Sequence, residues 1–342
     1  MRPCDDGAMR AAPPVLLPWI EAAQELRAAL RYDGLLWRRL AYLGAARGPW
    51  WWRRYTPRAF GAILCSLLHE QRRIVADNWR IMRVADGALE AQRGALQTFV
   101  AFAECLTDGL ESIGRGLDGY SVDSPNDDRF VDAATRGRGA LLLTAHTGSW
   151  EVIGRLIGKK HGIAVTMVMT AEQNASTRGF AEALRREGDA DFEVVYVGAD
   201  PLAALPLMSA LRRGRVVALQ FDRAPGGMAS LAVPFFGRMQ RFAAGPFRLA
   251  QVTGAPVIAA FTRRTGYRSY AIDIPEVIGV ERARGPRGDE LVRDAIARTA
   301  RELERFVRAN PAQWFHFEEL SSTLATPSEI AARDASLRGA PA

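Results

Sequence analysis

The spacing of apolar residues along the chain changes near residue 135. Before that point, in residues 18–46 and 59–92, apolar side chains recur three and four positions apart, which is the period of amphipathic helices. After it, short runs rich in branched and aromatic residues alternate with stretches of helical period. Such alternation is typical of helices packed on the faces of a sheet. We therefore predict an α/β fold, with a helical N-terminal portion packed on a mixed α/β sheet.

The individual elements follow from the same pattern. Strands are expected at residues 139–145, 164–169, 193–197, 215–221, 231–236, 256–262 and 268–274. Helices are expected at 149–159, 171–187, 201–213 and 242–253, with a last amphipathic helix over 289–309 that ends at Asn310-Pro311. We divide the chain into a helical N-terminal region (1–135), an α/β core (136–320) and a small, polar tail (321–342) that we expect to be frayed.

The basic composition favours anionic partners. The formal net charge is +7, and the only lysines are Lys159 and Lys160, so the positive charge is almost entirely arginine. A GC-rich genome explains this bias equally well, but guanidinium groups also bind phosphate through two hydrogen bonds. The basic residues are scattered and form no RNP, zinc-finger or basic-zipper pattern, so we expect no nucleic-acid partner. Three cysteines without a CxxC pair indicate a reducing compartment and no metal site.

One N-terminal segment has the composition of an interfacial membrane anchor. Residues 48–58, GPWWWRRYTPR, place three consecutive tryptophans beside arginines. Indole prefers the headgroup layer, and arginine pairs with anionic lipid. The other interpretation is that these rings pack the helical portion onto the sheet. The first ten residues do not form a signal peptide, and apolar runs such as 59–68 are shorter than the roughly 20 residues that a spanning helix needs. We expect a peripheral or monotopic protein on an anionic membrane surface.

The candidate chemistry lies in the run HTGSWE, residues 146–151. His146 directly follows the predicted buried strand GALLLTA, at the edge where open α/β sheets bind their ligands. Ser149 is a plausible N-cap, which places Glu151 in the first turn of the next helix. Acyl transfer from a thioester requires a base that deprotonates the acceptor hydroxyl, and histidine titrates near neutral pH. We predict His146 as this base and Glu151 as the carboxylate that orients it; a purely structural histidine is the alternative.

Several blocks in order resemble the bacterial lipid A biosynthesis (lauroyl/myristoyl) acyltransferase family of the lysophospholipid acyltransferase superfamily. HTGSWE is similar to that family's HxGNWE block, and VALQFDRAPGG followed by LAVPFFGRMQRFAAGPFRLAQVTGAPVIAAF is similar to its second block. NPAQWFHF (310–317) resembles the closing segment, and RRIVADNW (72–79) resembles an N-terminal helix of the family. The resemblance runs from about residue 70 to 318.

The resemblance implies an HxxxxE site that opens on an acyl groove. The donor would be acyl-CoA or an acyl carrier protein thioester, used as a co-substrate with no cofactor. The acceptor would be a hydroxyl of a lipid or glycolipid at the cytoplasmic face of the bacterial inner membrane. Asp222 and Arg223 match the family's Asp-containing turn, and Arg238 and Arg241 follow the PFFG strand. We predict these four residues as substrate-binding; a local Asp–Arg pair and a solvated loop are the alternatives.

Three departures bear on the acceptor. The chain has no strongly apolar anchor, the stretch VTMVMTAEQN lacks the family's arginine, and HFEEL lacks its basic ending. The acceptor is therefore open among lipid A precursors, another glycolipid, an ornithine-type lipid and a secondary metabolite. Two other functions also remain open: hydrolysis of acyl thioesters with the same two residues, and membrane binding without catalysis.

Overall fold

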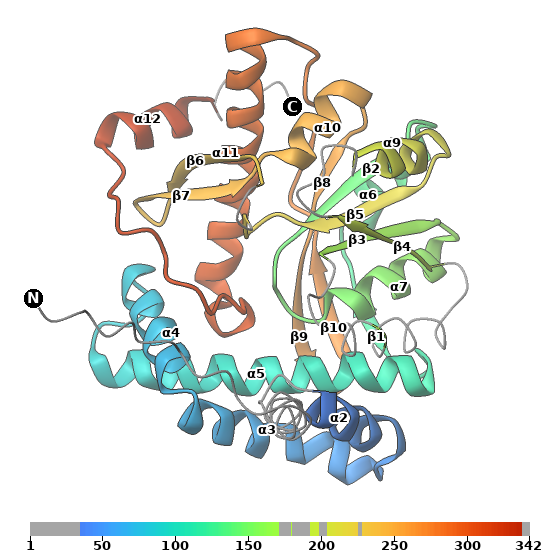
Figure 1. The fold of residues 1–342 in the computed structure, drawn as a ribbon, viewed down its shortest axis with the longest axis vertical. Coiled ribbons are helices and arrows are strands. Elements are labelled where there is room, and N and C mark those ends of the chain that lie inside the picture. The colour runs from blue at the N-terminus through green and yellow to red at the C-terminus, as the bar shows by residue number, and fades with distance from the viewer. Residues whose placement is uncertain (1–34, 171–178, 180–191, 198–203, 225–227, 337–342) are drawn as a thin grey trace, which may run out of the picture.

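A layer of helices forms one side of the molecule. The computed structural model describes residues 35–170, 179, 192–197, 204–224 and 228–336. The long helix α5 (Ala88–Arg115) lies across the base of the α/β part in Figure 1. Against it pack α2 (Leu35–Arg47), α3 (Trp50–Leu67) and α4 (His69–Ile81), and apolar residues of α3 and α4 share one buried cluster with it. The helical N-terminal portion expected from the sequence is confirmed for these residues, while residues 18–34 lie outside the described part.

A six-stranded sheet forms the centre of the α/β part. Its strand order is β11-β8-β2-β5-β3-β4, and every neighbouring pair is parallel except β11 with β8. The strands are β2 (Ala140–Thr144), β3 (Val165–Thr170), β4 (Phe192–Val197), β5 (Val216–Gln220), β8 (Val257–Ala259) and β11 (Val277–Ile278). All five residues of β2 are buried, as expected of a central parallel strand that is covered on both faces.

Helices connect and cover these strands. They are α6 (Asp127–Thr135), α7 (Trp150–His161), α9 (Ala204–Arg212), α10 (Gly245–Thr253) and α11 (Gly285–Ala309), followed by a 3-10 turn, η2 (Pro311–Gln313). Two apolar clusters, one on each side of β2, form the core. Alternate residues of β2 divide between them, since Leu141 and Leu143 belong to one cluster and Leu142 to the other.

Two smaller sheets complete the fold. β1 (Ser121–Asp123), β10 (Ser269–Asp273) and β9 (Phe261–Gly266) form one, and β6 (Ser230–Phe235) pairs with β7 (Arg238–Ala243) in a hairpin. The expected run 256–262 is split into β8 and β9 at Ala260, whose N–H bonds the carbonyl of Leu143 as the chain leaves the central sheet.

Several elements differ from the sequence prediction. β1, β7 and β11 were not expected, and the helix expected from residue 242 begins at Gly245 because residues 238–243 form β7. The described part of the expected tail contains a helix, α12 (Pro327–Ser336). The expected helix 171–187 lies outside the described residues apart from position 179. The mixed α/β fold itself is confirmed.

Candidate active site

His146 forms a buried pair with Asp222. Nδ1 of His146 lies 2.8 Å from Oδ1 of Asp222, and the backbone N–H of His146 donates to Oδ2 at 3.1 Å. The Asp222 side chain is fully buried, whereas that of His146 is 28% exposed. A carboxylate accepts only, so the Nδ1 contact places the proton of a neutral imidazole on Nδ1 and leaves Nε2 as the free base. The pair therefore has the composition of a general base with its orienting acid.

The strand register explains why these two residues meet. β2 and β5 are parallel neighbours, and Thr144 lies opposite Gln220 at their carboxyl ends. His146 and Asp222 each follow two residues later, so they leave the sheet at the same level. The carboxyl edge of a parallel sheet is where open α/β folds place their ligands. The position predicted for His146 is thus confirmed.

Burial and the groups around Asp222 shift the pKa of its carboxyl in opposite directions. Burial alone raises the pKa of this carboxyl. His146, with His316 and the indole N–H of Trp314, outweighs burial and holds the pKa of Asp222 well below its usual range. Asp222 therefore stays ionised at neutral pH. Asp222 is buried and bonded to the imidazole of His146, and its role in substrate binding stays a prediction.

Trp314, in the C-terminal segment, holds the carboxylate of Asp222 in place. Its Nε1–H donates to Oδ2 of Asp222 at 2.9 Å, and its ring stacks on His316 at 4.5 Å. Burial lowers the pKa of His316 to about 4, so this second histidine is neutral at pH 7. The indole and the backbone N–H of His146 thus fix the same carboxylate oxygen.

The loop that carries His146 is held on two further sides. Thr147 pairs with Trp314 in an isolated β-bridge, and its carbonyl accepts from the Thr262 hydroxyl at 2.6 Å. Gly148 has a φ of +52°, and an added Cβ would lie 2.6 Å from Oγ1 of Thr262. Glycine is required here because other residues rarely adopt this backbone conformation and no space is free.

A pocket of about 320 Å³ opens beside the imidazole. One wall is the face of α5 that carries Phe102, Cys105, Leu106, Gly109 and Leu110. The opposite lining comes from the loop after β2, the end of β5 and the C-terminal segment: His146, Gly148, Ser149, Trp150, Gln220, Arg223, Phe315 and Phe317. The lining is mainly apolar with few polar groups, which is the usual composition of a site for an apolar ligand.

Of the three arginines predicted to bind substrate, one lines this pocket and two do not. Arg223 lines it and donates to the carbonyl of Phe315 at 2.8 Å. Arg238 bonds the carbonyls of residues 321 and 322, and Arg241 bonds Ser230 within the β6–β7 hairpin. Neither arginine of the hairpin lines the pocket. Their role in substrate binding stays a prediction.

Glu151 is the second residue of α7, and Ser149 is the N-cap, as predicted, although its side chain forms no capping bond. The side chain of Glu151 lies outside the described part of the structure, so its contact with His146 stays a prediction. Among the described side chains, Asp222 is the acid bonded to the imidazole.

Sequence reasoning missed three contributors to the site. These are Trp314, the α5 wall, and Gln220, whose buried Nε2 has no hydrogen-bond partner among the described residues. The one available signal was Gln220, the last residue of a predicted strand that ends like the strand before His146. Nothing local in the sequence indicates that α5 faces the site.

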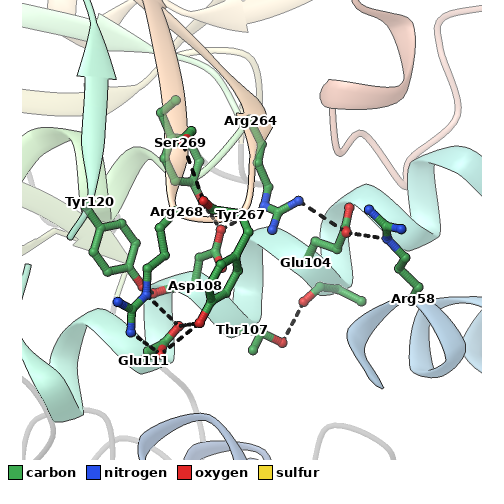
Figure 2. Close-up of polar contacts among 12 residues, drawn as sticks. Arg58, Glu104, Thr107, Asp108, Glu111, Tyr120, Arg264, Tyr267, Arg268 and Ser269 are labelled. Carbon is green, nitrogen blue, oxygen red and sulfur yellow. Dashed lines mark hydrogen bonds and ion pairs between the residues drawn. The ribbon is translucent and has the colours of Figure 1, made fainter. Parts of the chain in front are cut away.

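The far side of α5 carries a row of carboxylates, drawn in Figure 2. Glu104, Asp108 and Glu111 reach from α5 toward Arg264 of β9 and Arg268 of the β9–β10 turn. The Arg264 Nε lies 2.7 Å from Oδ2 of Asp108, which also accepts from the Tyr270 hydroxyl at 2.6 Å. Burial raises the pKa of Asp108, and Arg264 and Tyr270 oppose this effect. These contacts fix the position of the pocket wall relative to the β9–β10 hairpin.

Fold and site together define an α/β protein with a histidine–carboxylate pair beside an apolar pocket. The chain belongs to the bacterial lipid A biosynthesis acyltransferase family, whose model matches residues 119–321. It is therefore a member of an acyltransferase family of lipid biosynthesis.

Two named relatives share the central part of the chain. A phosphatidylinositol mannoside acyltransferase of Mycobacterium tuberculosis is 27% identical over 195 residues, which are 55% of this chain and 56% of the relative. The corresponding protein of Mycolicibacterium smegmatis is 29% identical over 147 residues, 43% of this chain and 47% of the relative. The chain thus spans about half the length of the curated relatives it matches.

Proposed function

We propose that the protein transfers a fatty acyl group from acyl-CoA or an acyl carrier protein thioester to a hydroxyl of a lipid or glycolipid acceptor. The observation that carries this proposal is the His146–Asp222 pair on the wall of an apolar pocket. The named relatives act on a phosphatidylinositol mannoside, which makes a phosphate-bearing glycolipid the acceptor class to test first.

The reaction needs one base and no enzyme nucleophile. Nε2 of His146 takes the proton of the acceptor hydroxyl as its oxygen attacks the thioester carbonyl. Asp222 stabilises the imidazolium that forms. When the tetrahedral intermediate collapses, the carbon–sulfur bond breaks and the leaving thiolate receives the proton from His146. Ester and free thiol are the products, so the balance closes without a co-reactant.

Two pocket groups suit the charge that develops on the thioester oxygen. The N-terminus of α7 opens on the pocket at Ser149 and Trp150, where the helix dipole favours negative charge. Arg223 lines the same pocket, with Glu318 3.7 Å from its Nε. We propose that Arg223 binds either this oxyanion or a phosphate of donor or acceptor.

The experiment measures thiol release from palmitoyl-CoA and from acyl carrier protein thioesters, with and without bacterial lipid extract. Wild type should release thiol in an extract-dependent manner, and His146→Ala should lower the rate about 10²–10⁴-fold, the usual range for loss of a general base. His161→Ala is the matched control, because His161 bonds Asp127 and does not line the pocket. Release without extract would identify a thioesterase. No release from any donor would refute the catalytic proposal.

We also propose that α2 and α3 rest on an anionic membrane, at the cytoplasmic face of the bacterial inner membrane. Among the described residues, no helix is long and apolar enough to cross a bilayer. The indoles of Trp50, Trp51 and Trp52 are 59%, 51% and 45% exposed, and their helix packs mainly on α5. Exposed apolar side chains continue along both helices: Leu40, Leu43, Tyr55, Phe60, Ile63 and Leu67. Exposed arginines flank them, among them Arg47 and Arg54. Exposed tryptophan beside arginine suits the headgroup layer.

Flotation with vesicles tests this membrane face. Replacing both Trp50 and Trp51 by Ala should weaken binding to vesicles that contain phosphatidylglycerol by about 10-fold or more, since each tryptophan loses part of its buried area. Leu324→Ala is the control, because Leu324 is 69% exposed but lies outside α2 and α3. Equal binding by wild type and the double variant would refute the proposed surface.

A further inference from the structure

One face of α5 lines the pocket, and another face contacts the β9–β10 hairpin. The row Phe102, Cys105, Leu106, Gly109 and Leu110 lines the pocket, with the three-and-four spacing of one helix face. The row of carboxylates in Figure 2 faces the β9–β10 hairpin. Because buried ion pairs hold that second row, the wall cannot recede easily to admit a larger ligand.

Gly109 is an unusual residue for this position. It is buried in the interior of a 28-residue helix, where glycine is unfavourable relative to alanine. Its φ is not positive, so the backbone does not require glycine. Gly109 borders the pocket, so the lack of a side chain leaves space along this wall. Cys105, one turn earlier, is also small, and burial raises the pKa of its thiol, so it acts as lining rather than as a nucleophile.

The two ends of the wall can be told apart. Arg223 and His146 both bond the backbone of Phe315, whose ring packs on Phe102 at 5.4 Å between centroids. The polar, reacting end of the pocket therefore lies beside Phe102. Gly109 lies seven residues further along α5, about 10 Å at 1.5 Å per residue. An extended chain advances roughly 1.2 Å per bond, so this distance corresponds to about nine carbons.

We propose that Gly109 sets the length of acyl chain that the pocket accepts. This inference rests on the proposed transfer of a fatty acyl group. With glycine at the far end of a fixed wall, a donor chain longer than about nine carbons passes α5 without obstruction. A larger side chain there would close the passage and restrict the protein to shorter donors.

The test compares octanoyl-CoA with palmitoyl-CoA, as transfer to lipid extract and as binding of each donor by calorimetry. Gly109→Leu should lower the palmitoyl-to-octanoyl ratio by about 4-fold for each methylene excluded, thus by at least about 15-fold, since more than two carbons of palmitate lie beyond the closed passage. Leu110→Ala, which widens the same end, should raise the ratio. Ala88→Leu adds comparable bulk at an exposed position of α5 and should leave the ratio unchanged.

Each failure has its own signature. An unchanged ratio in Gly109→Leu would overturn the inference, and so would an equal loss with both donors, which indicates a structural role. If circular dichroism shows that Gly109→Leu does not fold, Leu110→Ala still tests the inference, because it should raise the palmitoyl-to-octanoyl ratio and an unchanged or lower ratio would overturn it. If wild type binds both donors but transfers neither, the proposed function fails while the binding ratio still tests Gly109.

Discussion

Replacing Asp222 by Asn keeps the shape of a fully buried side chain and removes its charge. The structure dictates how the new amide must lie. The position of Oδ2 receives two donors, the N–H of His146 at 3.1 Å and the indole N–H of Trp314 at 2.9 Å. The amide oxygen must therefore occupy that position, and the NH₂ group then faces Nδ1 of His146. A donor there forces the imidazole proton onto Nε2, the atom that has to act as base.

The size of the effect follows from the geometry. A unit charge about 4 Å from the developing imidazolium is worth ~4 kcal/mol at an effective dielectric constant of 20. At 1.36 kcal/mol per factor of ten, the loss of this charge lowers the rate about 10³-fold. The wrong tautomer adds to this, and the equivalent change in serine proteases lowers kcat about 10⁴-fold. We expect kcat of Asp222→Asn to fall 10³–10⁴-fold, with a small change in KM.

The assay is acyl transfer to lipid extract, with unfolding in urea measured on the same samples. Trp314→Phe removes one hydrogen bond to the carboxylate and keeps the charge. Its expected loss is ~10-fold, at the lower end for a bond to a charged group. Glu151→Gln, measured in parallel, tests the partner that the sequence favours. If Asp222→Asn stays within 10-fold of wild type while Glu151→Gln is inactive, our assignment of the orienting acid is refuted.

Three further predictions concern stability and the loop at His146. Arg264→Ala leaves the 1%-exposed Asp108 without its cation and should lower the free energy of unfolding in urea by about 3–5 kcal/mol. Gly148→Ala places a Cβ 2.6 Å from Oγ1 of Thr262 at a φ of +52°, so we expect a loss of more than ~1 kcal/mol and a lower kcat. The pKa of His316 is lowered to about 4, so the folded state favours its neutral form. Its contribution to stability is present above the unfolded pKa of about 6.5 and is lost as the pH falls toward 4; His316→Phe should flatten this part of the stability profile.

A different result would refute each of these three predictions. The exposed pair of Arg287 and Glu281 is the control for the buried one, and Arg287→Ala should cost less than about 1 kcal/mol. Equal costs for both arginine variants would contradict the argument from burial. Full activity in Gly148→Ala would mean that the loop tolerates a different backbone. An unchanged profile in His316→Phe between pH 6.5 and 4 would assign the acid sensitivity to other groups.

Much of the fold can be predicted from periodicity, because the local pattern of apolar residues shows which positions of an element are buried. β2 is apolar along its whole length, as a central parallel strand must be. The sequence of β7, RMQRFA, is polar and only partly buried over its first four residues, so it carried no such signal. The break between β8 and β9 was also invisible, since the apolar run 256–262 continues through Ala260. There the chain passes from one sheet to another, which only the tertiary structure determines.

The position of His146 was predictable from the sequence, whereas its contact with Asp222 was not. His146 follows a strand that the sequence shows to be buried, so its position at the sheet edge could be inferred. Its partner depends on β5 lying next to β2, although β3 and β4 intervene in the chain. Proximity in sequence favoured Glu151, five residues away, over Asp222, 76 residues away. The register of Thr144 with Gln220 makes the distant residue the neighbour.

The blocks that carry the family resemblance share a physical centre, the C-terminal segment around Trp314. HTGSWE contributes the loop of His146, which bridges to this segment, and the second block contributes Asp222, which bonds the indole. The PFFG strand places the ring of Phe235 5.7 Å from that of Trp314. From the N-terminal block, Asn78 donates to the carbonyl of residue 318 at 2.8 Å and accepts from the N–H of residue 320. Each block thus contributes either to the His146–Asp222 pair or to the segment that supports it. Their order along the chain therefore indicates one contact network, and a change in any block should reach His146 through the position of Trp314.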